Sequence, residues 1–214
     1  MPFLAFEGLD GSGKSTLMNQ LEAQLKQNHI LVMRTREPGG TELGEEIRQL
    51  ILRTSGEAPV PRTELLLYQA IRAQHVEQKI KPALARQEWV LSDRFAASSI
   101  AFQAGGRSIS QEDVVWLNQF STKGLQPDLT VLLDLPVEDS LARREQRQQK
   151  TGIQADRIEK EKNDFHQRVR DSFLQQAQQN KENWLVLDAE KPTEELMKIL
   201  WSDLRRRNWV SSQS

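Results

Sequence analysis

The sequence predicts an α/β fold: a doubly wound sheet of five parallel strands with helices on both faces. Short apolar segments alternate along the chain with longer segments whose apolar residues recur at helical spacing. Such alternation is typical of parallel strands joined by right-handed helical crossovers. The 214 residues suffice for one domain, and neither an internal repeat nor a linker divides them. We therefore expect one domain over residues 1–208 and a frayed tail over 209–214.

Each expected element follows from its local pattern. Leu17, Leu21 and Leu25 give the first helix its apolar stripe, and Ser110 is a plausible N-cap of a later one. A proline at position 82 could break the longest helix. The expected strands are 3–6, 30–34, 89–93, 129–135 and 184–187. The expected helices are 14–28, 42–53, 63–85, 110–122, 137–149, 157–180 and 193–206, with a polar gap at 151–156.

Composition excludes several classes of function. The 29 basic and 30 acidic residues leave a net charge of -1, without the basic excess of a protein that binds nucleic-acid polymers. Cysteine is absent, which excludes disulfides, thiolate zinc sites and cysteine nucleophiles. The three histidines do not pair at metal-ligand spacing. Because no apolar run approaches about 20 residues, we expect a soluble, cytoplasmic protein without a membrane partner.

The clearest motif is a phosphate-binding loop. Gly8-x-x-x-x-Gly13-Lys14-Ser15 satisfies the Walker A pattern, in which glycines let the backbone N–H groups curl around an anion. Lys14 would hold the β and γ phosphates of ATP, and Ser15 would offer its hydroxyl to Mg²⁺. A chance match in a Gly-rich turn is the alternative, but the preceding strand and following helix favour a P-loop NTPase. The expected ATP-binding residues are Gly8, Leu9, Asp10, Gly11, Ser12, Gly13, Lys14 and Ser15.

Two arginines are expected beside this loop. Arg36 follows the second strand, and Asp93-Arg94 ends the third, so both motifs reach the strand ends where such sheets bind ligands. Asp93 could hold Mg²⁺ through water, and Arg94 could bridge the donor and acceptor phosphates. Either arginine alone could simply form a surface ion pair. Together they favour a phosphorylated acceptor over attack by water.

Taken together, these segments resemble the bacterial thymidylate kinase family over nearly the whole chain. The stretch Thr-Arg-Glu-Pro-Gly-Gly at 35–40 is the most specific of them. The resemblance implies transfer of the ATP γ-phosphoryl group to dTMP with Mg²⁺, giving dTDP and ADP for dTTP biosynthesis. The matching segments are 6–16, 35–40, 64–68, 72–76, 93–95, 98–99, 102–103, 127–130 and 156–159.

The resemblance also implies roles for the phosphate side of the site. Asp10 should contact the sugar 3′-hydroxyl of dTMP and help to organise the water ligands of Mg²⁺. Arg36 and Arg94 should hold the acceptor phosphate, with Glu159 close to this network. No general base is needed if the acceptor phosphate attacks as a dianion, because positioning and charge neutralisation then dominate.

Further roles concern the base and sugar of dTMP. Tyr68, where the family more often has Phe, should stack on thymine, although its helical spacing from Leu65 would by itself favour a core residue. Arg72 lies one helical turn further on and should hydrogen-bond a base carbonyl. The resemblance places Ser98 and Ser99 near the base, and Gln103 beside the sugar.

A cluster of basic residues suggests a lid at about 143–157. By itself, such a cluster most simply indicates a solvated charged helix. However, the P-loop has no arginine between its glycines, and family members of that kind carry the transfer-state cations on the lid. Arg147 and Arg157 are our candidates, and the sequence does not choose between them. Closure would also exclude water.

The chain departs from the family at a few positions. Phe95 and Phe102 stand where Tyr is common, and Ala104 replaces a frequent glycine. Phe102 lacks the hydroxyl that a Tyr would carry there, which could alter the exclusion of ribose, and discrimination of dTMP from dUMP is equally open. The resemblance further implies a homodimer, formed through helices of the 64–85 and 110–122 regions.

Two other classes of function have partial support in the sequence. Residues 180–183, Asn-Lys-Glu-Asn, superficially resemble the guanine-reading motif of GTPase switches, but they end in Asn and precede a strand. A catalytically silent nucleotide-binding protein is the other alternative. Intact Lys14, Ser15, Asp93 and Arg94 argue against it. A dTMP kinase remains the preferred hypothesis.

Overall fold

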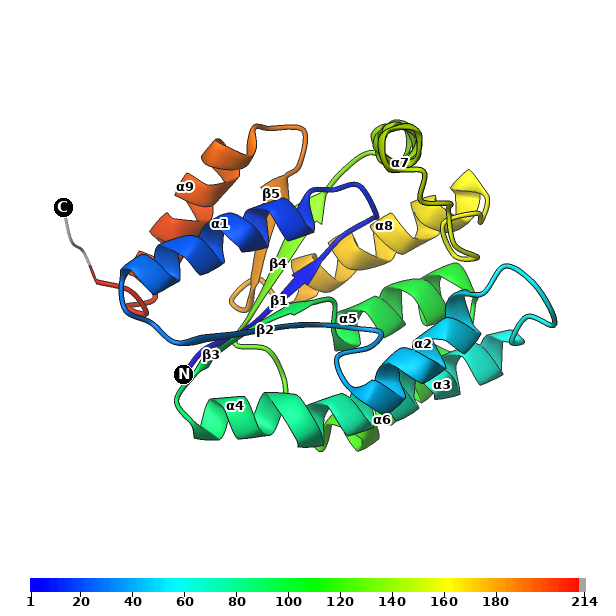
Figure 1. Cartoon of the computed structure of the whole chain (residues 1–214), viewed down its shortest axis with the longest axis horizontal. Helices are drawn as coiled ribbons and strands as arrows, with labels where there is room; N and C mark the ends of the chain where they lie inside the picture. Colours follow the sequence, from blue (N-terminus) through cyan, green and yellow to red (C-terminus); the bar gives the residue numbers. More distant parts are fainter. Residues whose placement is uncertain (212–214) are drawn as a thin grey trace.

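Five parallel strands form one sheet within residues 1–211, the part of the chain that the computed structural model describes (Figure 1). Their order is β2-β3-β1-β4-β5, and every neighbouring pair is parallel. This arrangement confirms the predicted doubly wound α/β fold. The strands are β1 (Phe3–Glu7), β2 (Val32–Arg36), β3 (Trp89–Asp93), β4 (Leu129–Asp134) and β5 (Trp184–Asp188).

Helices cover both faces of the sheet. One face carries α1 (Lys14–Gln27) and α9 (Thr193–Arg206), which pack on each other above the strands in Figure 1. The opposite face is covered by a second group of helices, most of which lie below the strands in the same view. These are α3 (Pro61–His75), η1 (Val76–Ile80), α4 (Lys81–Ala85), α5 (Ala96–Ser99), η2 (Ile100–Gly106), α6 (Gln111–Thr122) and α8 (Asn163–Gln179).

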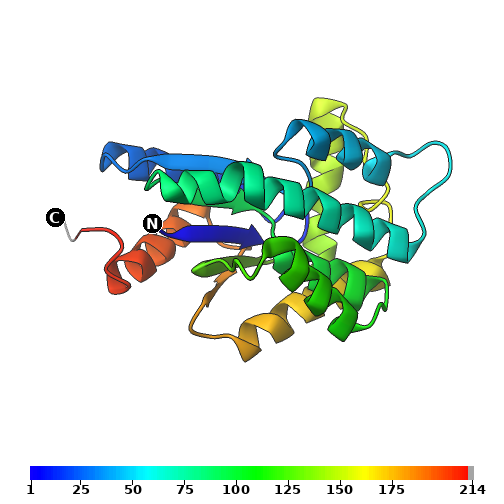
Figure 2. The same ribbon diagram turned by 90° about the horizontal axis from the view of Figure 1, so that it is seen from below.

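Two further helices lie at the carboxyl ends of the strands. α2 (Glu42–Leu52) packs on α3, and α7 (Val137–Thr151) packs on α8. Figure 2 shows both helices at the end of the molecule towards which β1 points, on the far side from the two termini. The predicted ligand-binding edge of the sheet is therefore flanked by helices that follow β2 and β4.

The central strand β1 joins the two halves of the core. All five of its residues are buried, and their side chains alternate between the faces. Leu4 and Phe6 pack with α1 and α9, whereas Phe3 and Ala5 pack with η1 and α4. Since β1 is buried on both faces, the P-loop that follows it starts from a fixed point.

The helix expected at 63–85 differs in detail. It begins at Pro61, which occupies the first helical position that suits proline. It does not break at Pro82 but widens into the π-helical turn η1 directly before it. This wider turn accommodates the proline ring, which would otherwise meet a carbonyl of the preceding turn.

Two predicted boundaries in other regions were wrong. The helix expected at 157–180 starts only at Asn163, because Asp156 accepts hydrogen bonds from the Ile158 and Glu159 N–H groups, both at 2.9 Å, and forms a turn. The second strand runs over Val32–Arg36 rather than 30–34, so Arg36 is its last residue. The short helices α5 and η2 were not predicted.

The chain end also corrects the sequence-based expectation. Trp209 packs edge-to-face against Trp89, with ring centroids 6.2 Å apart, and Val210 is only 8% exposed. The expected fraying from residue 209 is therefore wrong for these two residues, and 212–214 lie outside the described residues. None of the helices in the described part of the chain has the length and apolar character needed to cross a membrane.

Candidate active site

A cavity of about 490 Å³ opens at the carboxyl ends of β1, β2 and β3. Its size is typical of small-molecule sites. Most of the predicted site residues line it, namely Asp10, Gly11, Gly13, Lys14, Ser15, Arg36, Tyr68, Arg72, Asp93, Arg94, Ser98, Ser99, Gln103 and Arg147. The cavity, as the described residues define it, is not lined by four other predicted site residues, namely Gly8, Leu9, Ser12 and Arg157.

The P-loop surrounds the first turn of α1. Gly13 is the N-cap of this helix at a φ of 92°, so the initial N–H groups of α1 point towards the cavity as an anion-binding surface. Gly8 has a φ of 132°, and a Cβ there would lie 2.4 Å from the Leu133 carbonyl oxygen. The loop therefore requires glycine at position 8, although Gly8 does not line the cavity.

Lys14 and Ser15 lie at the donor side of the cavity. The Lys14 ammonium donates to the carbonyl oxygens of Gly8 at 3.1 Å and Leu9 at 2.9 Å. Burial, assisted by the Arg94 charge, lowers the pKa of Lys14. Ser15 Oγ donates to Asp93 Oδ2 at 3.2 Å, which joins the P-loop to the end of β3.

Arg94 lies between the donor side and the rest of the cavity. Its guanidinium donates to Asp10 Oδ1 at 2.9 Å and to Ser98 Oγ at 3.3 Å, and it stacks 4.9 Å from the centre of the Phe102 ring. Burial opposes ionisation of Asp10, but the charges of Arg94 and Lys14 outweigh it and hold the pKa of Asp10 below its usual range. Asp10 therefore belongs to both sides of the cavity.

Arg36 occupies the outer rim. It pairs with Asp93 in the register of β2 and β3, so two of the predicted motifs meet side by side. Its side chain is 55% exposed and donates to Glu45 Oε2 at 2.9 Å. The guanidinium is thus oriented by α2 and remains accessible to a ligand.

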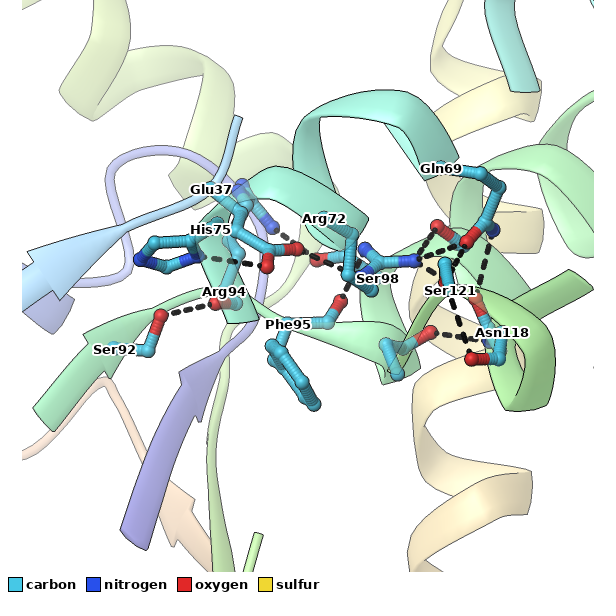
Figure 3. A network of polar contacts seen from close by, with 12 residues as sticks. Glu37, Gln69, Arg72, His75, Ser92, Arg94, Phe95, Ser98, Asn118 and Ser121 are labelled. Carbon is cyan, nitrogen blue, oxygen red and sulfur yellow. Dashed lines mark hydrogen bonds and ion pairs between the residues drawn. The ribbon is translucent and has the colours of Figure 1, made fainter. Parts of the chain in front are cut away.

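Arg72 is fixed by a buried polar network (Figure 3). Its side chain is 1% exposed and donates from Nε to Glu37 at 2.8 Å, and from Nη1 to Ser99 and Asn118, both at 2.8 Å. Glu37 also contacts His75 Nδ1 at 3.0 Å. Both Arg72 and Glu37 border the cavity. The network holds the segment after β2 against α3.

Tyr68 lies one helical turn before Arg72, and both line the cavity. The side chain of Tyr68 is partly exposed, so the alternative of a plain core residue does not hold. Gln103 is nearly buried and donates to Glu64 Oε1 at 3.1 Å. These residues place an aromatic ring and several polar groups at the inner end of the cavity.

The two candidate lid arginines have different surroundings. Arg147 lines the cavity, is 43% exposed and donates to Glu159 Oε1 at 2.6 Å. Arg157 instead donates to Glu64 Oε2 at 2.6 Å and to the Ile51 carbonyl oxygen at 3.0 Å. Glu64 is 1% exposed, so Arg157 compensates a buried carboxylate.

Several wall residues were missed as site candidates. Arg143 lines the cavity and donates to the carbonyl oxygens of Gly11 at 3.4 Å and Ala189 at 2.9 Å. Its position one turn before Arg147 was an available signal, since both share a face of α7. Arg48 and Asp156 also line the cavity, but they come from helix and turn segments without a recognisable motif.

Glu7 was missed as well. It is fully buried at the end of β1, and burial raises its pKa to about 7. Its partners lie on the segment that follows β3. Nothing in the local sequence indicates this long-range contact.

Comparison with known proteins agrees with this geometry. Residues 6–199 match the family model described as thymidylate kinase. A thymidylate kinase of Bdellovibrio bacteriovorus is 59% identical over 207 residues, covering 97% of each chain. One from Parasynechococcus marenigrum is 44% identical over 211 residues, covering 96% of this chain and 97% of the relative. One from Pseudomonas putida is 46% identical over 192 residues, covering 90% and 89%. The chain belongs to the thymidylate kinase family.

Proposed function

We propose that the chain transfers the γ-phosphoryl group of ATP to dTMP, giving ADP and dTDP. Family membership supports this reaction. The observation that carries it in the structure is a single cavity with the P-loop Lys14 at one side and Arg94, Arg72 and Tyr68 at the other. Such a cavity suits a nucleotide donor and a phosphorylated acceptor whose reacting groups meet between the two sides.

On the donor side, the P-loop N–H groups and Lys14 bind the triphosphate. Mg²⁺ would be held by Ser15 and, through water, by Asp93 and Asp10. The Ser15 hydroxyl and Asp93 carboxylate lie 3.2 Å apart on the wall, and both offer the oxygen ligands that Mg²⁺ prefers. When bound, Mg²⁺ neutralises phosphate charge. Mg²⁺ bound by nucleotide kinases usually keeps several water ligands and contacts the substrate phosphates, so few protein ligands are required.

On the acceptor side, Arg36 and Arg94 bind the phosphate of dTMP. Asp10 contacts the sugar 3′-hydroxyl, and Gln103 lies beside the sugar. Arg94 reaches Asp10, so the sugar and phosphate contacts share one ion pair. This pairing would hold the acceptor phosphate in line with the γ-phosphate, as transfer requires.

The base occupies the inner end of the cavity. Tyr68 stacks on thymine and Arg72 donates to a base carbonyl, with Ser98 and Ser99 nearby. The Arg72 network supports this role, because five groups around the guanidinium fix its direction before the base arrives.

The lid over residues 143–157 supplies cations for the transferring phosphoryl group. We favour Arg147, together with Arg143, because both line the cavity. Arg157 then anchors the end of the lid, after α7. Closure of α7 would exclude water and limit hydrolysis of ATP.

A homodimer is supported by an apolar patch on α6 and α3. Trp116 and Phe120 are 64% and 72% exposed, and their rings stack 5.8 Å apart. Leu66, on the helix packed beside α6, is 56% exposed. Contiguous exposed aromatic residues of this kind are typical of protein–protein interfaces. We also infer that residues 1–208 belong to one domain, onto which Trp209 and Val210 pack, and that the protein acts in the cytoplasm.

A coupled ADP-release assay tests the reaction. The protein is supplied with ATP, Mg²⁺ and either dTMP, dUMP, UMP or CMP, and we expect the highest kcat/KM with dTMP. Lys14→Ala should lower the rate by about 100-fold or more, which shows that turnover belongs to this site. Equal rates with UMP would contradict the thymidylate assignment while leaving a nucleotide kinase.

A further inference from the structure

Glu7 gathers three hydrogen-bond donors from one segment after β3. Its Oε1 accepts from the Phe95 N–H at 2.8 Å and the Ser98 N–H at 3.2 Å, and its Oε2 accepts from Ser98 Oγ at 2.6 Å. The carboxylate is fully buried. Burial of a carboxylate is unfavourable unless such donors compensate it, so the arrangement ties β1 firmly to this segment.

The contact acts as a helix cap supplied from another strand. Phe95 is the N-cap residue of α5 and has an apolar side chain that cannot accept a hydrogen bond. Glu7 accepts instead from the N–H of Phe95 itself and from the N–H of Ser98, the third residue of α5. The start of α5 is therefore fixed relative to the strand that carries the P-loop.

The Ser98 hydroxyl connects Glu7 to Arg94. A hydroxyl has one hydrogen to donate, and here it is directed to Glu7. Its lone pairs are then free to accept from Arg94 Nη1, 3.3 Å away. Because a guanidinium only donates, this bond requires the hydroxyl hydrogen to point away from Arg94. Glu7 sets that direction.

Arg94 needs such support. Its φ of 71° lies in the left-handed region, which costs a non-glycine residue about 1 kcal/mol or more. The Arg94 N–H donates to the Phe6 carbonyl at 2.9 Å, and Ser92 Oγ donates to the Arg94 carbonyl at 2.7 Å, the second bond being visible in Figure 3. Glu7 directly follows Phe6, so the backbone and the guanidinium of Arg94 are both held from the end of β1.

We propose that Glu7 is a positioning residue for Arg94, acting through the Ser98 hydroxyl and the cap of α5. The proposal rests on the proposed function, in which Arg94 binds the acceptor phosphate. The charged groups that face Glu7 are Arg94, 3.9 Å away, and Lys14. Glu7 therefore aligns the acceptor side from the strand that supports the donor side.

Glu7→Gln tests the proposal with little change in volume. The new amide would donate to Ser98 Oγ instead of accepting from it, so the residue at position 7 would no longer hold the hydroxyl hydrogen away from the Arg94 guanidinium. At pH 8, where the wild-type carboxylate is ionised, we expect kcat/KM for dTMP to fall about 10- to 100-fold. We expect KM for ATP to stay within about twofold, since the P-loop contacts are unchanged.

Asp128→Asn is the matched control. Asp128 Oδ2 accepts from the Phe3 N–H at 2.7 Å and so anchors the other end of β1. The control loses a carboxylate that binds the same strand but lies away from Arg94. Its kcat/KM for dTMP should stay within about twofold of wild type.

Ser98→Ala supplies a second, independent variant. It removes the bridging hydroxyl from a partly exposed site, and we expect kcat/KM for dTMP to fall at least about threefold. Because both residues act in one chain of contacts, the Glu7→Gln/Ser98→Ala double variant should lose less than the product of the two single effects.

Three results would overturn the proposal. The first is a folded Glu7→Gln protein whose kcat/KM for dTMP stays within twofold of wild type. The second is an equal loss towards ATP and dTMP, which would indicate a distorted P-loop. If Glu7→Gln does not fold, a Ser98→Ala protein with unchanged kinetics is the third. A wild-type protein that does not turn over dTMP would instead contradict the proposed function.

Discussion

Arg157 donates to Glu64 at 2.6 Å across 93 residues of sequence. Arg107 donates to the same carboxylate oxygen at 3.2 Å, so Glu64 holds the end of the lid and the end of η2 together against α3. Arg157 is thereby separated in function from Arg147, although both were candidates for the same role. The two arginines should respond differently to removal.

Arg157→Ala should act on stability. It leaves a buried carboxylate with one fewer cation, and we expect the free energy of unfolding to fall by about 2 kcal/mol. Urea denaturation measures this loss, and kcat should stay within about threefold. A much larger loss of kcat without destabilisation would place Arg157 at the phosphates.

Arg147→Ala should act on catalysis. The side chain is 43% exposed and its partner Glu159 is 9% exposed, so its removal should lower the urea midpoint less than Arg157→Ala does. We expect kcat to fall by about 100-fold, because a cation that faces the transferring phosphoryl group stabilises its charge. Steady-state assays on this variant and Arg157→Ala, run together, decide which arginine serves the reaction.

Glu37→Ala should both destabilise the fold and weaken dTMP binding. The pair with Arg72 is almost fully buried, and removing one partner leaves an uncompensated charge, at a cost of about 3 kcal/mol. Arg72 also loses an orienting contact, so KM for dTMP should rise. Glu77→Ala removes an exposed partner of Lys81 further along the same helical segment and should leave urea denaturation unchanged.

The pH dependence of stability should reveal the buried Glu7. Its pKa is about 7 in the folded protein against 4.5 when exposed, so between these values the folded state binds more protons. The free energy of unfolding contributed by this group therefore falls as the pH rises from about 4.5 to 7. Urea denaturation at pH 5 and 8 should show that wild type loses more stability than Glu7→Gln over this interval.

Trp116→Glu should dissociate the proposed dimer. A charge within the stacked pair of Trp116 and Phe120 would be buried in the interface without a partner. Sedimentation velocity should then give a monomer, whereas wild type gives a dimer. Leu31→Glu, at another exposed apolar residue with 66% exposure, is the control and should remain dimeric. A monomeric wild type would contradict the dimer itself.

Local sequence patterns were sufficient for much of this architecture. The strand Trp89–Asp93 and the helix Thr193–Arg206 have the bounds that were predicted, because a compact apolar run and a regular helical stripe mark them. The P-loop residues Gly8, Gly13 and Lys14 were recognisable because their spacing follows from the backbone conformation that phosphate binding requires.

Other features depend on contacts that no local pattern records. Glu7 accepts from Ser98, 91 residues away, and Arg157 meets Glu64 across a similar distance. Asp156 accepts two hydrogen bonds from its own turn, which delays the start of the expected helix to Asn163. Such local side-chain bonds compete with helix formation. The helix α5 has only four residues, and η2 ends in Gly105 and Gly106, which weaken the helical signal although tertiary packing fixes both elements.

The ion pair between Asp10 and Arg94 has a consequence for which anions the cavity accepts. The two groups lie 2.9 Å apart and largely neutralise each other. Inorganic phosphate would have to compete with Asp10 for the guanidinium without any contact from a base or sugar to offset the loss. A whole nucleotide gains additional binding energy from its base and sugar, remote from the phosphate. The ion pair therefore favours binding of a whole nucleotide over binding of free inorganic phosphate.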